Sequence, residues 1–178
     1  VPQSFTSPTY SQKIDGLRAV FPPEPQERSE IRDKRGNLIL QGTWTRVPGA
    51  VDVRLSCRAD SRTYLTSLET RVPFPLRNLG PELAEYLQST EQVQADNPRI
   101  RRLAAELAKG VKTEYDAVLR IVSWVVDHVR YVNPPVRYDA LYSLETGKGN
   151  CQNYSHLSAA LLRSLGIPTR IVVGVTLN

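Results

Sequence analysis

The sequence predicts an α+β protein in which an antiparallel β region precedes a helical region. Two observations carry this prediction. Residues 28–76 contain short runs of β-branched and aromatic residues separated by turn signals, and residues 51–58 alternate strictly between apolar and polar side chains. After Pro81 the apolar residues recur at helical spacing instead, and capping residues stand before several of these runs.

The β region follows a segment of different composition. Residues 1–27 are rich in Pro, Ser and Gln, which predicts an extended arm or linker. A small β-rich domain is expected over residues 28–90, with a turn around Gly36. The alternation predicts a half-buried strand with Cys57 on its buried face, and a further strand is expected over Tyr64–Val72.

The helical region is expected over residues 91–178, after a short helix at 81–89. Asn97 and Thr113 are predicted N-caps of two helices, the second of which carries a wide apolar face as far as Val129. Residues 131–146 are predicted to be a connection. A helix is expected over 151–165, ended by Gly166, and residues 170–177 are predicted to form a strand.

Composition excludes several classes of protein. The chain has 178 residues, 40% of them hydrophobic, and a net charge of +5. The basic residues do not form the dense stripe with aromatics that marks nucleic-acid binders. No apolar run approaches the ~18 residues that span a bilayer. No His/Cys cluster has zinc spacing, so no metal and no cofactor is expected.

Cys151 follows a Gly-rich turn and opens a predicted helix, with Asn150 as its N-cap. Backbone N–H groups in a first helical turn stabilise anions, and the thiolate is the nucleophilic form of cysteine. The same N–H groups could form an oxyanion hole, so Asn150 and Gln152, which flank the cysteine, are candidates to contribute to it. These residues alone leave two readings open: a reactive nucleophile, or a buried first-turn cysteine.

The segment CQNYSHLSAALLRSLGIPTR resembles the nucleophile segment of the transglutaminase-like superfamily of bacterial type, with Cys151, Gln152, Asn153 and Tyr154 at matching positions. The resemblance covers about residues 95–178. It implies a papain-like fold in which the helix that bears the cysteine packs on an antiparallel sheet. It also implies a protein or peptide substrate and an acyl-enzyme formed at Cys151.

The resemblance implies a Cys–His–Asp triad whose His and Asp follow residues 171–175. Neither His128 nor His156 stands at the matching position, and both are expected to be structural. The chain is therefore expected to be the front half of a longer enzyme and to be inactive alone. Without later strands, Leu157, Leu161 and Leu165 would face water, so a second chain or the β region is expected to cover them.

Four aromatic residues are candidates for a substrate cleft: Trp124, Tyr138, Tyr142 and Tyr154. The expected function is a transglutaminase-like cysteine enzyme that hydrolyses a peptide or glutamine amide or transfers its acyl group. The alternative is a non-catalytic binding or structural module of the cell envelope. The missing Met and the Pro/Ser-rich start favour an extracytoplasmic protein and fit an excised domain equally well.

Overall fold

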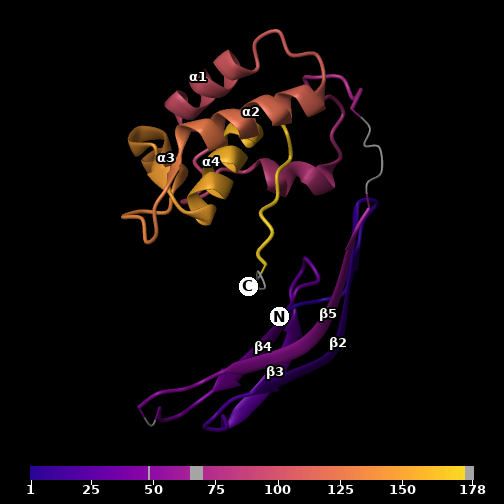
Figure 1. Ribbon diagram of the computed structural model, residues 1–178, viewed down its shortest axis with the longest axis vertical. Helices are drawn as coiled ribbons and strands as arrows, with labels where there is room; N and C mark the ends of the chain where they lie inside the picture. Colours follow the sequence, from indigo (N-terminus) through magenta and orange to yellow (C-terminus); the bar gives the residue numbers. More distant parts are fainter. Residues whose placement is uncertain (48, 65–69, 175–178) are drawn as a thin grey trace. The chain divides into compact units, whose positions relative to one another are not determined.

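The computed structural model describes residues 1–47, 49–64 and 70–174, and it confirms the α+β class. The chain divides into two compact units, Val1–Ser67 and Leu68–Asn178. Strands make up the first unit and helices dominate the second (Figure 1). The division falls after Ser67 rather than at residues 27 and 90, because residues expected in the N-terminal arm pair with a strand that ends at Thr63.

The first unit contains an antiparallel sheet in the order β1-β2-β5, formed by Phe5–Thr6, Tyr10–Val20 and Arg54–Thr63. The prediction of an extended arm over residues 1–27 is wrong for β2, which pairs with β5 from Tyr10 opposite Thr63 to Val20 opposite Arg54. The polar composition hid this strand, because its ladder is made by backbone groups that composition does not reveal.

A hairpin forms the rest of the first unit. It joins β3 (Glu27–Arg32) to β4 (Leu38–Thr43), and its turn contains Gly36 at a φ of 78°. The Asp33 carboxylate accepts the backbone N–H groups of Arg35 and Asn37 across this turn. The turn predicted around Gly36 is thus confirmed, and glycine suits it because positive φ costs little without a Cβ.

The prediction that Cys57 is buried is wrong, since every residue of β5 is exposed and Cys57 is a free, exposed thiol. An alternating pattern leads to burial only where a second layer covers one face, and β5 is an edge strand of its sheet. Of the strand expected over Tyr64–Val72, residues 65–69 lie outside the described residues. Tyr64 and residues 70–72 are not in a strand.

The second unit is built from helices whose ends follow the predicted caps. Asn97 accepts the Arg99 N–H at 2.9 Å, and Thr113 accepts the Asp116 N–H at 3.1 Å. The helices are η1 (Pro81–Leu87, a 3-10 helix), α1 (Pro98–Leu107), α2 (Glu114–His128), α3 (Ala140–Thr146) and α4 (Cys151–Ser164). Among the described residues, no helix combines the length and apolar character needed to cross a membrane.

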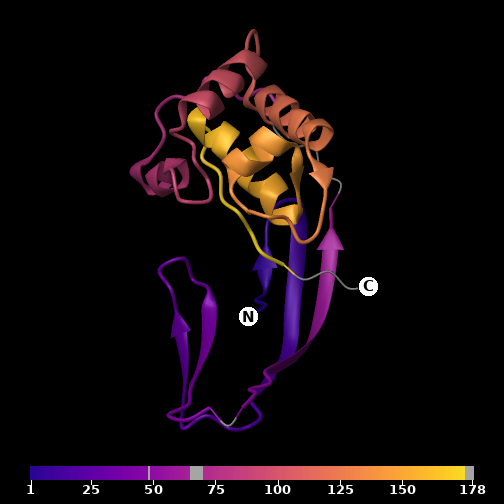
Figure 2. The same cartoon turned by 90° about the vertical axis from the view of Figure 1, so that its left-hand side faces the viewer.

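Helix α4 forms the centre of the helical unit and packs against α1, α2 and α3 (Figure 2). Leu157 and Leu161 of α4 are fully buried, and Leu165 is half-buried against the same cluster. The expectation that a second chain or the β region is needed to cover these leucines is therefore wrong. The partners that bury them come from earlier helices: Ile100 and Ala104 of α1, and Ala117, Ile121 and Val125 of α2.

The segment between α2 and α4 has more structure than the connection that the sequence predicted. It contains α3 and two short strands, β6 (Arg130–Tyr131) and β7 (Lys148–Gly149), which pair in parallel. Asp139 caps α3, and Gly147 ends it at a φ of 61°. At the chain's far end, residues 170–174 are not in a strand, against the prediction, and residues 175–178 lie outside the described residues.

Candidate active site

Cys151 is the first residue of α4, and its thiol is exposed. The predicted cap is confirmed: the buried Asn150 side chain accepts the Gln152 N–H at 3.0 Å and also the N–H of Asn153. The cap occupies the backbone N–H of Gln152, so that group is not free to bind an oxyanion. Within the described residues, the backbone N–H of Cys151 itself has no hydrogen-bond partner.

The turn before Cys151 is held by the segment that follows α2. The N–H of Arg130 donates to the Gly147 carbonyl at 2.8 Å, and the N–H of Val132 donates to the Gly149 carbonyl at 2.8 Å. These two bonds make the parallel β6–β7 pair. The position of the thiol is thus fixed from outside its own helix.

Asn153 locks the first turn of α4 from within. Its side chain is fully buried, and its Oδ1 accepts the Asn150 N–H at 3.1 Å, which completes a capping box. Its Nδ2 donates to the Arg137 carbonyl at 3.0 Å and to Ser143 Oγ at 2.9 Å. One carboxamide therefore joins the turn before Cys151, the segment before α3, and α3 itself.

Both histidines of the chain bind backbone carbonyl groups. His128 Nε2 lies 3.0 Å from the Leu144 carbonyl, and His156 Nδ1 lies 2.6 Å from the Tyr138 carbonyl. A carbonyl only accepts, so each of these nitrogens carries a proton. His156 stands five residues after Cys151, which turns it about 140° around the helix. In the described part of the chain, no hydrogen bond joins either histidine to Cys151.

The four aromatic candidates for a substrate cleft are not brought together. Trp124 stacks on His128, with ring centroids 4.4 Å apart, and the Tyr154 hydroxyl donates to the Val129 carbonyl. Tyr142 is half-buried on α3. Tyr138 is the candidate that lines a cavity, and its exposed ring stands at the cavity's edge.

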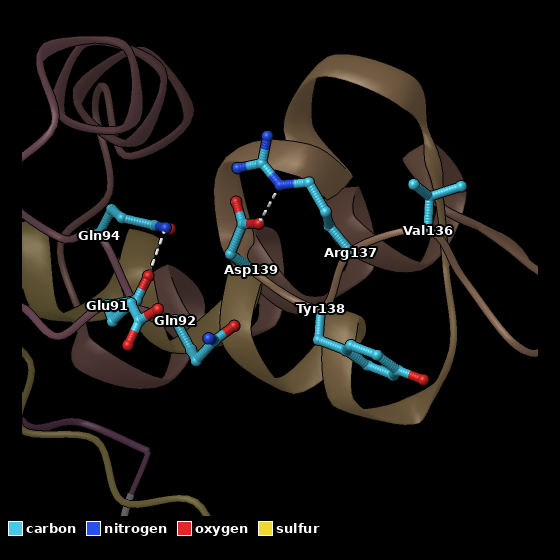
Figure 3. A pocket seen from close by; sticks show the side chains of 7 residues that line it. All are labelled: Glu91, Gln92, Gln94, Val136, Arg137, Tyr138 and Asp139. Carbon is cyan, nitrogen blue, oxygen red and sulfur yellow. Dashed lines mark hydrogen bonds and ion pairs between the residues drawn. The ribbon is translucent and has the colours of Figure 1, made fainter.

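That cavity, called the Arg137 cavity below, lies between residues before α1 and residues before α3 (Figure 3). Its volume is about 470 Å³, and its lining is mostly polar. The lining residues are Glu91, Gln92 and Gln94 on one side and Val136–Asp139 on the other. Cys151 does not line it. The Arg137 and Tyr138 carbonyls nevertheless accept hydrogen bonds from Asn153 and His156 of α4, so the cavity wall is bound to the helix that Cys151 opens.

Asp139 is the carboxylate that fixes this wall. Burial acts to raise its pKa, but the Tyr142 N–H at 3.0 Å and the Arg137 Nε at 2.8 Å, with the charge of the guanidinium, together lower the pKa below its ordinary 3.8. The carboxylate is 9% exposed, whereas the Arg137 side chain is 60% exposed. The buried Asp139 carboxylate therefore holds the ion pair in place.

The pKa of Asp139 predicts an acid-dependent loss of stability. Because the folded-state pKa is lowered, the stabilisation is present above pH 3.8 and is lost as pH falls through the folded value. We expect Asp139→Asn, which retains a capping oxygen, to lose less stability than the parent protein between about pH 7 and about pH 3. Urea unfolding at both pH values measures this, and equal losses would contradict it.

No group of three or more His, Cys, Asp or Glu side chains within the described ranges is placed to hold a metal ion. Sequence reasoning missed Arg137, Asp139 and Gln92 as members of a cavity. Asp139 followed by an apolar run and then Gly147 is a helix signal that could have revealed α3. Nothing local in the sequence indicates that residues 91–94 lie across from residues 136–139.

The chain is similar in sequence and in fold to known proteins. Residues 101–178 match the model of the transglutaminase-like superfamily. The chain is 32% identical over 92 residues to an uncharacterized protein of Mycobacterium leprae (strain TN), a match that covers 51% of this chain and 32% of that protein. A "putative cysteine protease" from Cytophaga hutchinsonii has a similar crystal structure, with a TM-score of 0.71 and 20% identity, over 94% of this chain and 57% of that one.

The segment from residue 101 to residue 178, which includes α4 and Cys151, is similar to the transglutaminase-like superfamily, and the fold is that of the Cytophaga protein. The chain spans about a third of the Mycobacterium protein and somewhat more than half of the Cytophaga structure.

Proposed function

We propose that this chain carries the nucleophile of a cysteine enzyme that acts on a peptide or glutamine amide through a thioester at Cys151. The observation that supports the proposal most strongly is the placement of an exposed thiol on the first residue of a capped helix, beside a free backbone N–H. The match of residues 101–178 to the model of the transglutaminase-like superfamily supports the same role.

In the proposed reaction the Cys151 sulfur attacks the acyl carbon of the amide, and the carbon–nitrogen bond breaks. The leaving amine takes up the proton that the thiol lost. Water or a second amine then attacks the thioester, the carbon–sulfur bond breaks, and the thiol is regenerated. The Cys151 N–H is placed to donate to the oxyanion of either tetrahedral intermediate. Water gives hydrolysis, and an amine gives acyl transfer.

The superfamily resemblance implies a histidine as the base. His128 and His156 both hold backbone carbonyls of other segments. A test of the nucleophile should therefore use a probe that reacts with the thiol without a turnover cycle. A peptide that carries a chloromethyl ketone in place of the scissile amide is such a probe, because the thiol displaces chloride directly.

We expect the peptidyl probe to label Cys151 and to leave Cys57 largely unmodified, as judged by peptide mass mapping. Cys57 is a matched control, because it is the chain's other cysteine and is also exposed. The variants Cys151→Ser and Cys57→Ser assign the label. Equal labelling at both thiols would contradict the proposal and favour a non-catalytic binding module on the same scaffold.

A simple alkylator should also discriminate between the two thiols. We expect iodoacetamide near neutral pH to modify Cys151 about two- to fivefold faster than Cys57, because backbone N–H groups of a first helical turn stabilise negative charge on an attacking sulfur. Cys57 lies mid-strand in β5 and has no such groups aimed at it. Timed quenching followed by mass spectrometry gives both rates in one sample. Equal rates would show that the helix end does not activate the thiol.

A further inference from the structure

The Arg137 cavity has a frame that its own hydrogen bonds hold in place. Gln94 donates to the Glu91 carbonyl at 2.6 Å and accepts the Leu141 N–H at 3.3 Å. Asp139 accepts from Arg137 Nε and from the Tyr142 N–H. Both ends of the Gln94 carboxamide and both oxygens of the Asp139 carboxylate are therefore occupied, so these groups shape the cavity rather than bind a ligand.

Other polar groups of the cavity have no partner within the described residues. Arg137 uses only Nε, which leaves its two terminal nitrogens free, and no hydrogen bond is made by the Gln92 carboxamide or the Tyr138 hydroxyl. Figure 3 shows the terminal nitrogens of Arg137 on the side of Gln94, and the Gln92 side chain extending toward Tyr138. These free groups are donors or can act as donors.

The free pair of nitrogens on Arg137 forms a fork that matches the two oxygens of a carboxylate. The ion pair with Asp139 holds the guanidinium by its other edge and so fixes the direction of the fork. The Gln92 amide is a further neutral donor of the lining, whereas the Tyr138 ring extends away from Arg137 (Figure 3). This arrangement suits a planar anion that accepts several hydrogen bonds.

We propose that the Arg137 cavity binds a carboxylate group of a peptide, and thereby selects acidic peptides for the enzyme. The inference rests on the proposed function, since it takes a peptide as the substrate. Asn153 and His156 tie the cavity wall to α4, so the wall is held in a fixed position relative to the helix that begins with Cys151. Glu91 is the exposed carboxylate of the lining, and its charge opposes the bound anion.

Direct binding to the Cys151→Ala protein tests the inference without any turnover. Three peptides that differ at a single position, Glu, Gln or Lys, are titrated by calorimetry at low salt. We expect the Glu peptide to bind about fivefold more tightly than the Gln peptide, and the Lys peptide to bind most weakly. Equal affinities for the three peptides, or no binding of the Glu peptide, would overturn the proposal.

Variants of the lining sharpen the test. Arg137→Lys keeps the charge but removes the fork. We expect this variant to bind the Glu peptide about fivefold more weakly and to bind the Gln peptide with unchanged affinity. Glu91→Gln should increase the affinity for the Glu peptide about twofold, because a negative charge that repels the peptide's carboxylate is removed. Arg102→Lys, on the exposed face of α1, is the matched control and should change nothing. Failure of both lining variants to change the affinity would refute the site.

Two precautions keep the result interpretable. Arg137→Lys also alters the contact with Asp139, so its far-UV circular dichroism is compared with that of the parent protein, and Gln92→Ala serves as a second variant that leaves this ion pair intact. We expect Gln92→Ala to reduce the affinity for the Glu peptide about twofold. Selective labelling of Cys151 without a preference for acidic peptides would overturn the cavity's role alone. A preference for acidic peptides without selective labelling would overturn the nucleophile alone.

Discussion

Replacing Asn153 by alanine is expected to destabilise the helical unit by about 3 to 5 kcal/mol, because three hydrogen bonds are lost at a fully buried side chain. The Asn150 N–H and the Arg137 carbonyl would each lose their partner. Each buried polar group left without a partner costs about 1–3 kcal/mol. Urea unfolding followed by circular dichroism measures the change.

Gln152→Ala is the control for this variant, since Gln152 is the neighbouring residue on α4 and is exposed. We expect its effect to stay within about 0.5 kcal/mol. The Asn153 variant should also slow the alkylation of Cys151 toward the rate of Cys57, because the turn that presents the thiol is no longer held. A loss of less than about 1 kcal/mol would mean that the carboxamide does not anchor this turn.

The second large effect is expected from Gly149→Ala. A Cβ at Gly149 would lie 2.6 Å from Cγ of Asn153 and closer still to its Cβ. The Asn153 side chain cannot turn away without breaking its three hydrogen bonds, so the turn before Cys151 must shift instead. We expect a destabilisation of about 3 kcal/mol, the upper end of the range for overpacked interiors, measured by the same unfolding experiment.

Gly174→Ala is a matched control, because a Cβ there meets no atom within 4 Å. A double variant separates the clash from a general effect of alanine at position 149. If the clash with Asn153 causes the loss, Gly149→Ala combined with Asn153→Gly, which removes Cβ as well as the carboxamide, should destabilise the protein by less than the sum of the single variants. Strict additivity would show that the two residues do not interact.

Several features of the helical unit could be read from the sequence because they are local. Asn97, Thr113 and Asn150 each cap the helix that follows them, and each bonds to backbone groups only two or three residues away. The placement of Cys151 on a first helical turn follows from this chemistry, and the resemblance to the transglutaminase-like superfamily follows from the residues around it.

The sequence was less informative where the partner of a residue lies far along the chain. Cys57 was expected to be buried on one face of an alternating strand, yet the pattern does not say whether a second layer exists. Leu157 and Leu161 were expected to need a second chain or the β region to cover them, yet α1 and α2 already do so. Burial depends on which surfaces meet, and that is a property of packing rather than of local pattern.

The sequence by itself therefore determined the α+β class, the capped helices, the turn at Gly36 and the position of the thiol at the start of α4. The tertiary structure alone decided the rest of the site: Asn153 joins three segments, and Gln92 faces Arg137 and Tyr138 across a cavity. Helix caps and turns are fixed by hydrogen bonds within a few residues, which a sequence records directly. Cavity walls are set by contacts across about 45 residues, which exist only once α1, α3 and α4 have packed together.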